Sequence, residues 1–318
     1  MRPALVLLLA AALLTSCQKA GNKTIGVVPK GANHIFWLTV KAGAEKAAAE
    51  DGYSVEWNAP ALEIDAKRQQ DIVESMVNRK LAGIALAPVD KKALVNVVER
   101  AFAAGIPTVI YDSDVDTARR VSYIATDNRE GGRMAARRLG ESLGGKGKAG
   151  VIGFMPGSAS TMEREDGFME EMKARFPNVQ LLGVQFGMAD RAKAMAVTEN
   201  MMTAHPDLAG LFADNESSLS GAVQALKSRG AKGIKLVGFD ASDALITDLK
   251  DGWIDALVLQ DPYRMGYDSV RAITRKIQGD APSLRVDLPA TLATRADLEA
   301  GRVAKQLLPG FVAVAGAH

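Results

Sequence analysis

The sequence predicts an α/β protein with two similar lobes, each built on a doubly wound parallel sheet. Short, continuous apolar runs alternate with amphipathic helical stretches, the pattern of parallel strands covered by helices on both faces. Several segments of the first half recur in the second half at a nearly constant offset. The length of 318 residues is also that of two ordinary domains.

The internal similarity is the strongest of these observations, because four separate matches share one offset of about 125 residues. Each match pairs segments of the same local character, such as a strand with a strand. The matched segments are 26–28 with 150–152, 42–43 with 166–167, 81–86 with 208–213, and 105–112 with 233–240. The chain therefore contains two related halves.

Each half alternates strands and helices in the same order. Apolar residues at helical spacing justify the helices; in 66–79 these are Ile72, Val73, Met76 and Val77. In the first half we predict strands at 24–28, 54–57, 83–87 and 108–111, helices at 36–50, 66–79 and 91–104, and helix C-caps at Gly52 and Gly105. In the second half we predict strands at 149–154, 180–185, 210–213, 235–239 and 256–259, and a C-cap at Gly230.

The N-terminus has the pattern of a signal peptide over residues 1–16, with Arg2 before an apolar run at 5–14. About ten apolar residues are too few to cross a hydrocarbon core about 30 Å thick. Leu-Thr-Ser-Cys at 14–17 resembles the bacterial lipobox, whose cysteine becomes the lipid-modified first residue. We therefore expect an exported protein, periplasmic or at the cell surface, with a lipid anchor at Cys17 and a tether at 17–23. A plain signal peptide with an incidental cysteine is the alternative.

Composition and motifs argue against nucleic acid, metal and cofactor as partners. The 39 basic and 37 acidic residues form no basic stripe with interleaved aromatics. Asp112, Asp114 and Asp116 alternate like calcium ligands, but Thr117 stands where a glycine is needed and Tyr123 where a bidentate glutamate is needed. The sequence therefore predicts neither a metal site nor a cofactor, and the single cysteine allows no disulfide within the chain.

Catalytic motifs are equally incomplete. The segment 140–147 nearly matches a phosphate-binding loop, but Gly147 replaces the serine or threonine and a strand follows the segment instead of preceding it. The segment 150–153 lacks the full dinucleotide fingerprint. Only His34 could serve as the base of a Ser-His-Asp triad. We therefore expect no enzyme and no catalytic residues.

Candidate ligand contacts follow the predicted strands, because parallel sheets place ligands outside the carboxyl ends of their strands. Carboxylates accept hydrogen bonds from hydroxyls, amides donate and accept, and flat rings cover C–H faces, which together suit a polyol. Each of these candidates has a structural alternative. For Phe36 and Trp37 it is a place in the core, for Asp112 and Asp240 it is helix capping, and for His34 it is a position in the cleft wall without a ligand contact. The predicted ligand-binding residues are His34, Phe36, Trp37, Asp112, Ser113, Met162, Arg164, Asn215, Asp240 and Gln260.

From about residue 24 to 288 the chain resembles the periplasmic sugar-binding proteins of the ribose and galactose type, which share a fold with the effector domains of LacI-type repressors. No single motif carries this resemblance; their order along the chain does. The motifs are Asn-His-Ile-Phe-Trp at 33–37, Ile-Pro leading to Asp at 106–112, Ile-Ala-Thr-Asp-Asn at 124–128 before Gly131-Gly132, Arg-Glu-Asp-Gly-Phe at 164–168, Ala-His-Pro-Asp at 204–207, Val-Gly-Phe-Asp at 237–240 and Gln-Asp-Pro at 260–262.

The resemblance implies a type I periplasmic binding protein fold with a three-strand hinge. It implies an N-terminal lobe of 24–126 plus 262–288 and a C-terminal lobe of 127–261 plus 289–308, before a disordered tail at 309–318. In such proteins the residues matching Phe36 and Trp37 sandwich the sugar ring. Hydroxyls are bound by those matching Asp112, Asn215, Asp240 and Gln260. A short helix at 297–307 is predicted from the residues themselves.

The departures from the family pattern concern the ligand. Met162 and Ser113 stand where the family often has arginines, and Ala87 where an asparagine is common. Ala189 stands where an aromatic can sit, and His34 replaces an asparagine. Because strong donors are missing, we expect a sugar-like ligand that is larger, less uniformly polar or deoxygenated, and not ribose.

These inferences predict a monomeric solute-binding receptor of an ABC transporter that captures a sugar-like molecule by hinge closure and then docks on the permease. Its only membrane contact would be the lipid anchor. A lipid-anchored sensor or chemotaxis receptor without uptake is the alternative. A repressor is disfavoured, because a signal peptide stands where its DNA-binding helices would be.

Overall fold

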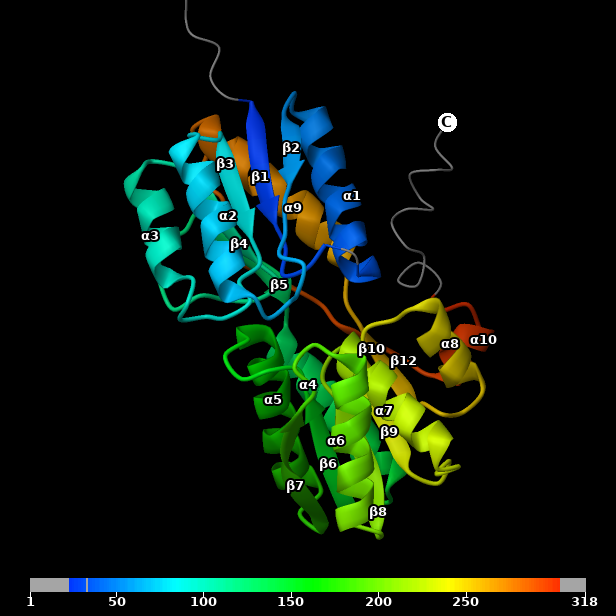
Figure 1. Ribbon diagram of the computed structural model, residues 1–318. Helices are drawn as coiled ribbons and strands as arrows, with labels where there is room; N and C mark the ends of the chain where they lie inside the picture. The colour runs from blue at the N-terminus through cyan, green and yellow to red at the C-terminus, as the bar shows by residue number, and fades with distance from the viewer. Residues whose placement is uncertain (1–22, 33, 304–318) are drawn as a thin grey trace, which may run out of the picture.

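The computed structural model describes residues 23–32 and 34–303. Two lobes are stacked along the long axis of the molecule, each with one six-stranded sheet between layers of helices (Figure 1). The segments predicted as a signal peptide and as a C-terminal tail lie outside the described residues, as do Cys17, Asn33 and most of the predicted tether. Within the described part, no helix is both long and apolar enough to span a membrane.

The N-terminal lobe contains an all-parallel sheet in the order β11-β5-β4-β3-β1-β2. Helices α2 and α3 cover one face, and α1 and α9 cover the other (Figure 1). Its strands are β1 (Thr24–Val28), β2 (Ser54–Trp57), β3 (Gly83–Leu86), β4 (Thr108–Tyr111), β5 (Ser122–Thr126) and β11 (Arg285–Leu288). Its helices are α1 (Ile35–Glu50), α2 (Ala66–Asn78), α3 (Val95–Ala103) and α9 (Pro262–Ile277).

The C-terminal lobe repeats this arrangement in the order β12-β10-β9-β8-β6-β7, with only β12 antiparallel to its neighbour. Its strands are β6 (Gly147–Gly153), β7 (Val179–Phe186), β8 (Leu208–Ala213), β9 (Lys235–Phe239), β10 (Ala256–Leu259) and β12 (Thr291–Ala293). Its helices are α4 (Asn128–Ser142), α5 (Ala159–Arg175), α6 (Arg191–Ala204), α7 (Glu216–Ser228), α8 (Asp243–Lys250) and α10 (Arg295–Glu299).

The chain crosses between the lobes three times, after β5, after β10 and after β11. The first and third crossing segments are hydrogen-bonded to each other, because the backbone N–H of Asp127 donates to the carbonyl of Leu288 at 2.9 Å. The predicted fold class, two similar parallel-sheet lobes joined by a three-strand hinge, is confirmed.

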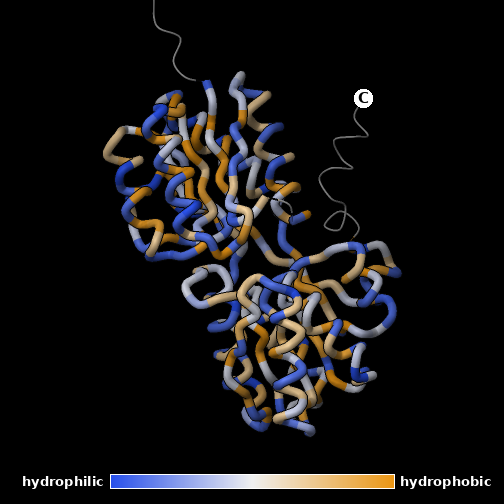
Figure 2. Tube along the Cα trace, in the orientation of Figure 1, coloured by the Kyte–Doolittle hydropathy of each residue, from blue (hydrophilic) through white to orange (hydrophobic). Residues whose placement is uncertain are grey.

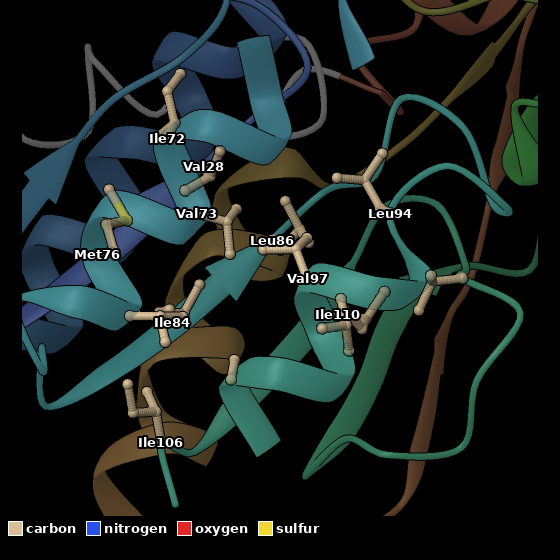
Figure 3. Close-up of a cluster of buried hydrophobic side chains, with 14 of the residues drawn as sticks. Val28, Ile72, Val73, Met76, Ile84, Leu86, Leu94, Val97, Ile106 and Ile110 are labelled. Carbon is tan, nitrogen blue, oxygen red and sulfur yellow. The ribbon is translucent and has the colours of Figure 1, made fainter. Parts of the chain in front are cut away.

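The apolar strands and the apolar faces of the helices form two hydrophobic layers in each lobe, one on each face of the sheet. Orange segments run through the interior of both lobes, and blue segments lie on their outer surfaces (Figure 2). Figure 3 shows one of these layers in the N-terminal lobe, where Ile72, Val73 and Met76 of α2 pack on Ile84 and Leu86 of β3. The four helical positions predicted to face the core, Ile72, Val73, Met76 and Val77, are all buried.

The duplication is also visible in how helix pairs pack. A Cβ on Gly43 of α1 would lie 2.0 Å from the carbonyl oxygen of Tyr263 in α9. A Cβ on Gly167 of α5 would lie 2.1 Å from the carbonyl oxygen of Arg129 in α4. These equivalent glycines let helix backbones touch directly, which a larger side chain would prevent.

Two helix predictions are wrong in their limits. The helix predicted at 91–104 begins at Val95, because Asp90 Oδ1 accepts the backbone N–H groups of Lys92 and Ala93 and holds a turn there. The helix predicted at 297–307 spans Arg295–Glu299 instead, after the capping box formed by Thr294 and Asp297, and residues 304–307 lie outside the described part.

Candidate functional site

A cavity of about 500 Å³ lies between the lobes, where the carboxyl ends of both sheets face each other. Its lining includes eight of the ten predicted contacts: His34, Phe36, Trp37, Asp112, Arg164, Asn215, Asp240 and Gln260. It also includes Lys30, Gly31, Ala32, Ala61, Leu62, Glu63, Phe154, Ser160, Thr161, Ala189, Asp190, Arg191, Ala192, Glu216 and Ser217. Both lobes therefore contribute polar groups to one shared cavity, which is the arrangement of a ligand site.

Asp112 and Asp240 directly follow β4 and β9, at equivalent positions of the duplication, and both have left-handed backbones. Their φ angles are 61° and 73°. Their backbone N–H groups donate to the carbonyls of Ile124 and Val258, on the neighbouring strands. Left-handed backbone costs free energy for a residue other than glycine, and such strain is concentrated at functional sites. Each sheet therefore presents one carboxylate to the cavity.

The carboxylate of Asp240 accepts hydrogen bonds from two groups of its own lobe. Gln260 Nε2 donates to Asp240 Oδ1 at 2.6 Å, and the backbone N–H of Glu216 donates to Oδ2 at 3.1 Å. Gln260 Oε1 in turn accepts from the Thr126 hydroxyl at 2.7 Å. Because Thr126 and Gln260 lie at the ends of two crossing segments, this chain of hydrogen bonds joins the hinge to the cavity.

Asp112 is paired with Lys30, a residue that sequence reasoning missed. Lys30 Nζ lies 2.9 Å from Asp112 Oδ2, and both side chains are almost fully buried. The same ammonium donates to Ser160 Oγ at 3.1 Å and to Ser158 Oγ at 3.3 Å, both in the other lobe. Its position just after β1 was a usable signal, because it follows a strand as the other site residues do.

His34 and Glu216 form a second contact across the cavity, with His34 Nε2 2.9 Å from Glu216 Oε2. His34 also caps α1, since its Nδ1 accepts the backbone N–H of Phe36 at 3.2 Å. The neutral ring with its proton on Nε2 satisfies both contacts. His34 thus serves as a helix cap and as part of the cavity wall.

The charges around this pair shift both pKa values. Burial lowers the pKa of His34, but Glu216, Glu63 and Asp240 more than offset it, so the pKa is raised. Burial raises the pKa of Glu216, but His34, Ser220 and Arg191 lower it to about 2. Glu216 is therefore a carboxylate at neutral pH.

The two aromatic residues do not form a sandwich. The ring centroids of Phe36 and Trp37 are 4.8 Å apart with an interplanar angle of 88°, so the rings touch each other and leave no space for a sugar between them. Trp37 is 4% exposed, and its Nε1 donates to Glu63 Oε1 at 2.7 Å. Burial raises the pKa of Glu63. The pair therefore offers the cavity one wall, with Phe36 the more exposed ring.

Arg164 lines the cavity, but its guanidinium is engaged within its own lobe. Nε donates to Asn128 Oδ1 at 2.8 Å, Nη1 donates to the carbonyl of Asp214 at 2.9 Å, and the group lies over the Phe239 ring at 4.1 Å. Arg164 is only 2% exposed. These contacts connect Arg164 to residues at the carboxyl ends of β8 and β9 and at the start of α4.

A buried acid pair, Glu165 and Asp214, lies beside Arg164. Burial and the charge of Asp214 raise the pKa of Glu165, and burial raises the pKa of Asp214 as well. Glu165 Oε1 and Asp214 Oδ1 have no hydrogen-bond donor among the described residues, whereas Asp214 Oδ2 accepts the N–H of Phe154 at 3.0 Å. A proton on Glu165 at neutral pH relieves the repulsion between the two carboxyls.

Ser113 and Met162 are the two predicted contacts that do not line the cavity. Ser113 is fully buried, and its Oγ accepts the backbone N–H of Ser160 at 3.1 Å, so it joins the two lobes instead. Met162 is half-buried on α5. Asn215 lines the cavity while also capping α7, because its Oδ1 accepts the N–H of Ser218 at 3.1 Å.

The described residues contain no group of three or more His, Cys, Asp or Glu side chains that could hold a metal ion. The cavity instead combines carboxylates, the amides of Asn215 and Gln260, and apolar rings. It can accept hydrogen bonds from several hydroxyls and cover one apolar face of a small molecule.

Comparison with known proteins gives a consistent result. The pattern described as periplasmic binding protein domain matches residues 25–281. The ribose import binding protein of Bacillus subtilis is 30% identical over 303 residues, covering 91% of this chain and 97% of the relative. The D-ribose/D-allose-binding protein of Pseudomonas aeruginosa is 30% identical over 311 residues, covering 90% and 97%.

Solved structures agree with these relatives. A carbohydrate transporter solute-binding protein from Agrobacterium radiobacter, in complex with D-arabinose, has a TM-score of 0.87 and 30% identity, covering 91% of this chain and 99% of its own. An ABC transporter solute-binding protein from Agrobacterium vitis, with bound D-fucose, has a TM-score of 0.86 and 31% identity, covering 89% and 99%.

Proposed function

Because this chain belongs to the periplasmic binding protein family, we propose that it is the sugar-binding receptor of an ABC transporter. The observation that carries the proposal is the pair of carboxylates, Asp112 and Asp240, presented by equivalent strand ends of the two lobes to one cavity. A ligand that contacts both lobes stabilises their closed arrangement, which the permease would then recognise. The relatives are named as binding proteins, and this proposal contains no catalytic step.

The ligand that we propose is a monosaccharide with an apolar or deoxygenated part. Lys30 is occupied by Asp112 and two serines, and Ser113 is used between the lobes, so the first lobe offers few free donors. Ala189 lines the cavity, and Met162 lies outside it. The structural relative with bound D-fucose, a sugar that lacks one hydroxyl, is consistent with such a site.

Thermal unfolding with a panel of sugars tests both the receptor proposal and the proposed ligand preference. The panel contains D-ribose, D-allose, D-arabinose, D-tagatose and D-fucose, each at millimolar concentration. A sugar at one hundred times its Kd should add about 2.7 kcal/mol to the free energy of unfolding and raise Tm by several degrees. If no sugar raises Tm, the receptor proposal fails. If D-ribose gives the largest shift, only the ligand preference fails.

We also propose that the receptor is exported to the periplasm as a monomer and anchored by lipid at Cys17. The lipobox-like 14–17 segment and the single cysteine support the anchor. Labelling expressing cells with an alkyne fatty acid should mark the protein with Cys17 but not a Cys17→Ala variant. Equal labelling of both proteins would contradict the anchor without affecting sugar binding.

A further inference from the structure

Lys30 belongs to the N-terminal lobe but makes its hydrogen bonds with the C-terminal lobe. Its ammonium lies 2.9 Å from Asp112 Oδ2, in its own lobe. Ser160 Oγ and Ser158 Oγ accept from it at 3.1 and 3.3 Å, at the start of α5. Lys30 is only 4% exposed, so these contacts are shielded from water and are stronger than surface contacts.

The same part of the C-terminal lobe is docked on the N-terminal lobe at two further points. The backbone N–H of Ser160 donates to Ser113 Oγ at 3.1 Å, and the backbone N–H of Lys91 donates to the carbonyl of Gly157 at 2.9 Å. Gly157 has a φ of 93°, which favours glycine, and a Cβ there would also lie 2.1 Å from Asp90 Oδ2. The start of α5 is therefore fitted closely against the other lobe.

Hinge opening would affect the contacts of Lys30 unequally. The Lys30–Asp112 ion pair lies within one lobe and survives the separation of the lobes. The hydrogen bonds to Ser158 and Ser160 join the two lobes and are lost when the lobes separate. The ammonium is thus bonded to a cavity-lining carboxylate in both states, but to the second lobe in the closed state alone.

We propose that Lys30 is a positioning residue that couples the ligand-contacting carboxylate Asp112 to closure of the two lobes, acting as a latch on Ser158 and Ser160. This inference rests on the proposed function, because it assigns a closing mechanism to the same site. A positioning role explains why a lysine stands where its N–H groups are directed to serines of the opposite lobe. The latch slows opening and therefore ligand release.

Dissociation rates in serine and lysine variants test the latch. Ser158→Ala is the sharpest change, because Ser158 does not line the cavity and its side chain makes no cap hydrogen bond. We expect it to raise the dissociation rate about three- to tenfold, with an association rate within twofold of the unmodified protein. Lys30→Met should raise the dissociation rate further. Lys91→Met is the control, since Lys91 Nζ pairs with Asp116 inside one lobe.

The measurement is stopped-flow binding of D-allose, D-ribose or D-arabinose, whichever binds the full-length protein most tightly. In the Lys30→Met background, adding Ser158→Ala should change the dissociation rate less than twofold, because both substitutions remove the same contact. An unchanged dissociation rate in Ser158→Ala overturns the proposal. Multiplicative effects of the two substitutions overturn it as well.

A second experiment needs no ligand, so it tests the Lys30 latch independently of the receptor proposal. Dyes are attached through Arg68→Cys and Lys193→Cys, exposed positions at the starts of α2 and α6, with Cys17→Ser in the same chain. Single-molecule energy transfer then reports the closed fraction. Lys30→Met should lower that fraction about tenfold, and equal fractions in the two proteins contradict the latch. Failure of every sugar to bind would instead refute the proposed function.

Discussion

His34 Nε2 lies 2.9 Å from Glu216 Oε2, so a helix cap of one lobe contacts a carboxylate of the other. Glu216 is held in place from its own side, because its Oε1 accepts from Arg191 at 2.8 Å and from Ser220 at 2.8 Å. The contact lies in the wall of the same cavity as Lys30 and Asp112. Besides the contacts of Ser113 and Lys91, polar side chains of the N-terminal lobe therefore bridge to the other lobe through Lys30 and through His34.

Replacing His34 separates its two roles. In His34→Asn the shorter side chain should still cap α1, because asparagine is a preferred N-cap residue, but it should not reach Glu216. We expect the Tm of the ligand-free protein to stay within about 2 °C and sugar affinity to fall about tenfold, as for loss of one charged hydrogen bond. Isothermal titration calorimetry measures the affinity. His205→Asn, at the C-cap of α6, is the matched control, and equal affinity in all three proteins would contradict the bridge.

Because Asp240 has a left-handed backbone, replacement by glycine should leave the protein more stable than replacement by alanine, the reverse of the usual order. Both substitutions remove the carboxylate, but alanine must adopt a φ of 73°. Asp240→Gly should therefore be more stable than Asp240→Ala by about 1–2 kcal/mol. Urea unfolding gives the comparison. At Asp251, where φ is −78°, the order should reverse, and the same order at both sites would disprove the strain argument.

The buried acid pair predicts a loss of stability at alkaline pH. The pKa of Glu165 is raised in the folded protein, so the folded state holds its proton more tightly than the unfolded chain does. The contribution is fully present below about pH 4.5 and is lost as the pH rises toward about 9. Glu165→Gln cannot ionise and should be more stable than the unmodified protein by about 1–3 kcal/mol at pH 8.5.

Chemical denaturation between pH 5 and pH 9 tests this expectation. The difference between Glu165→Gln and the unmodified protein should grow with pH. Glu170→Gln is the control, because Arg129 lowers the pKa of Glu170, and it should leave the alkaline part of the profile unchanged. A difference that is constant with pH would show that Glu165 stays ionised in the folded state.

The two adjacent aromatics should respond differently to truncation. Trp37 is 4% exposed and packs against Tyr111, with ring centroids 6.4 Å apart, so Trp37→Ala should reduce the free energy of unfolding by about 3–5 kcal/mol. Phe36 is more exposed to the cavity, so Phe36→Ala should cost less stability and mainly weaken sugar binding. Unfolding and calorimetry of both variants measure the two effects. A larger stability loss in Phe36→Ala would reverse the assignment.

Eight of the ten predicted contacts line the cavity, because their positions depend on strand ends. Asp112 and Asp240 occupy equivalent positions of a visible repeat, and the carboxyl ends of parallel strands meet at one edge of a sheet. Lys30 follows the same rule after β1, but a single lysine after an apolar strand is an ordinary surface pattern. Glu63 lies in a loop between β2 and α2, where residue spacing carries no information about direction.

The amino-acid order alone determined the two-lobed α/β architecture, the duplication and the strand ends that carry the acids, because hydrophobic periodicity and repeats are local properties of the chain. The tertiary structure decided which groups pair across the cavity: Lys30 with Ser158 and Ser160, and His34 with Glu216. It also turned Ser113 toward the other lobe and set the Phe36 and Trp37 rings at right angles. The contacts between the lobes join residues more than 40 positions apart, and their geometry depends on how the hinge places the two lobes, which no local pattern specifies.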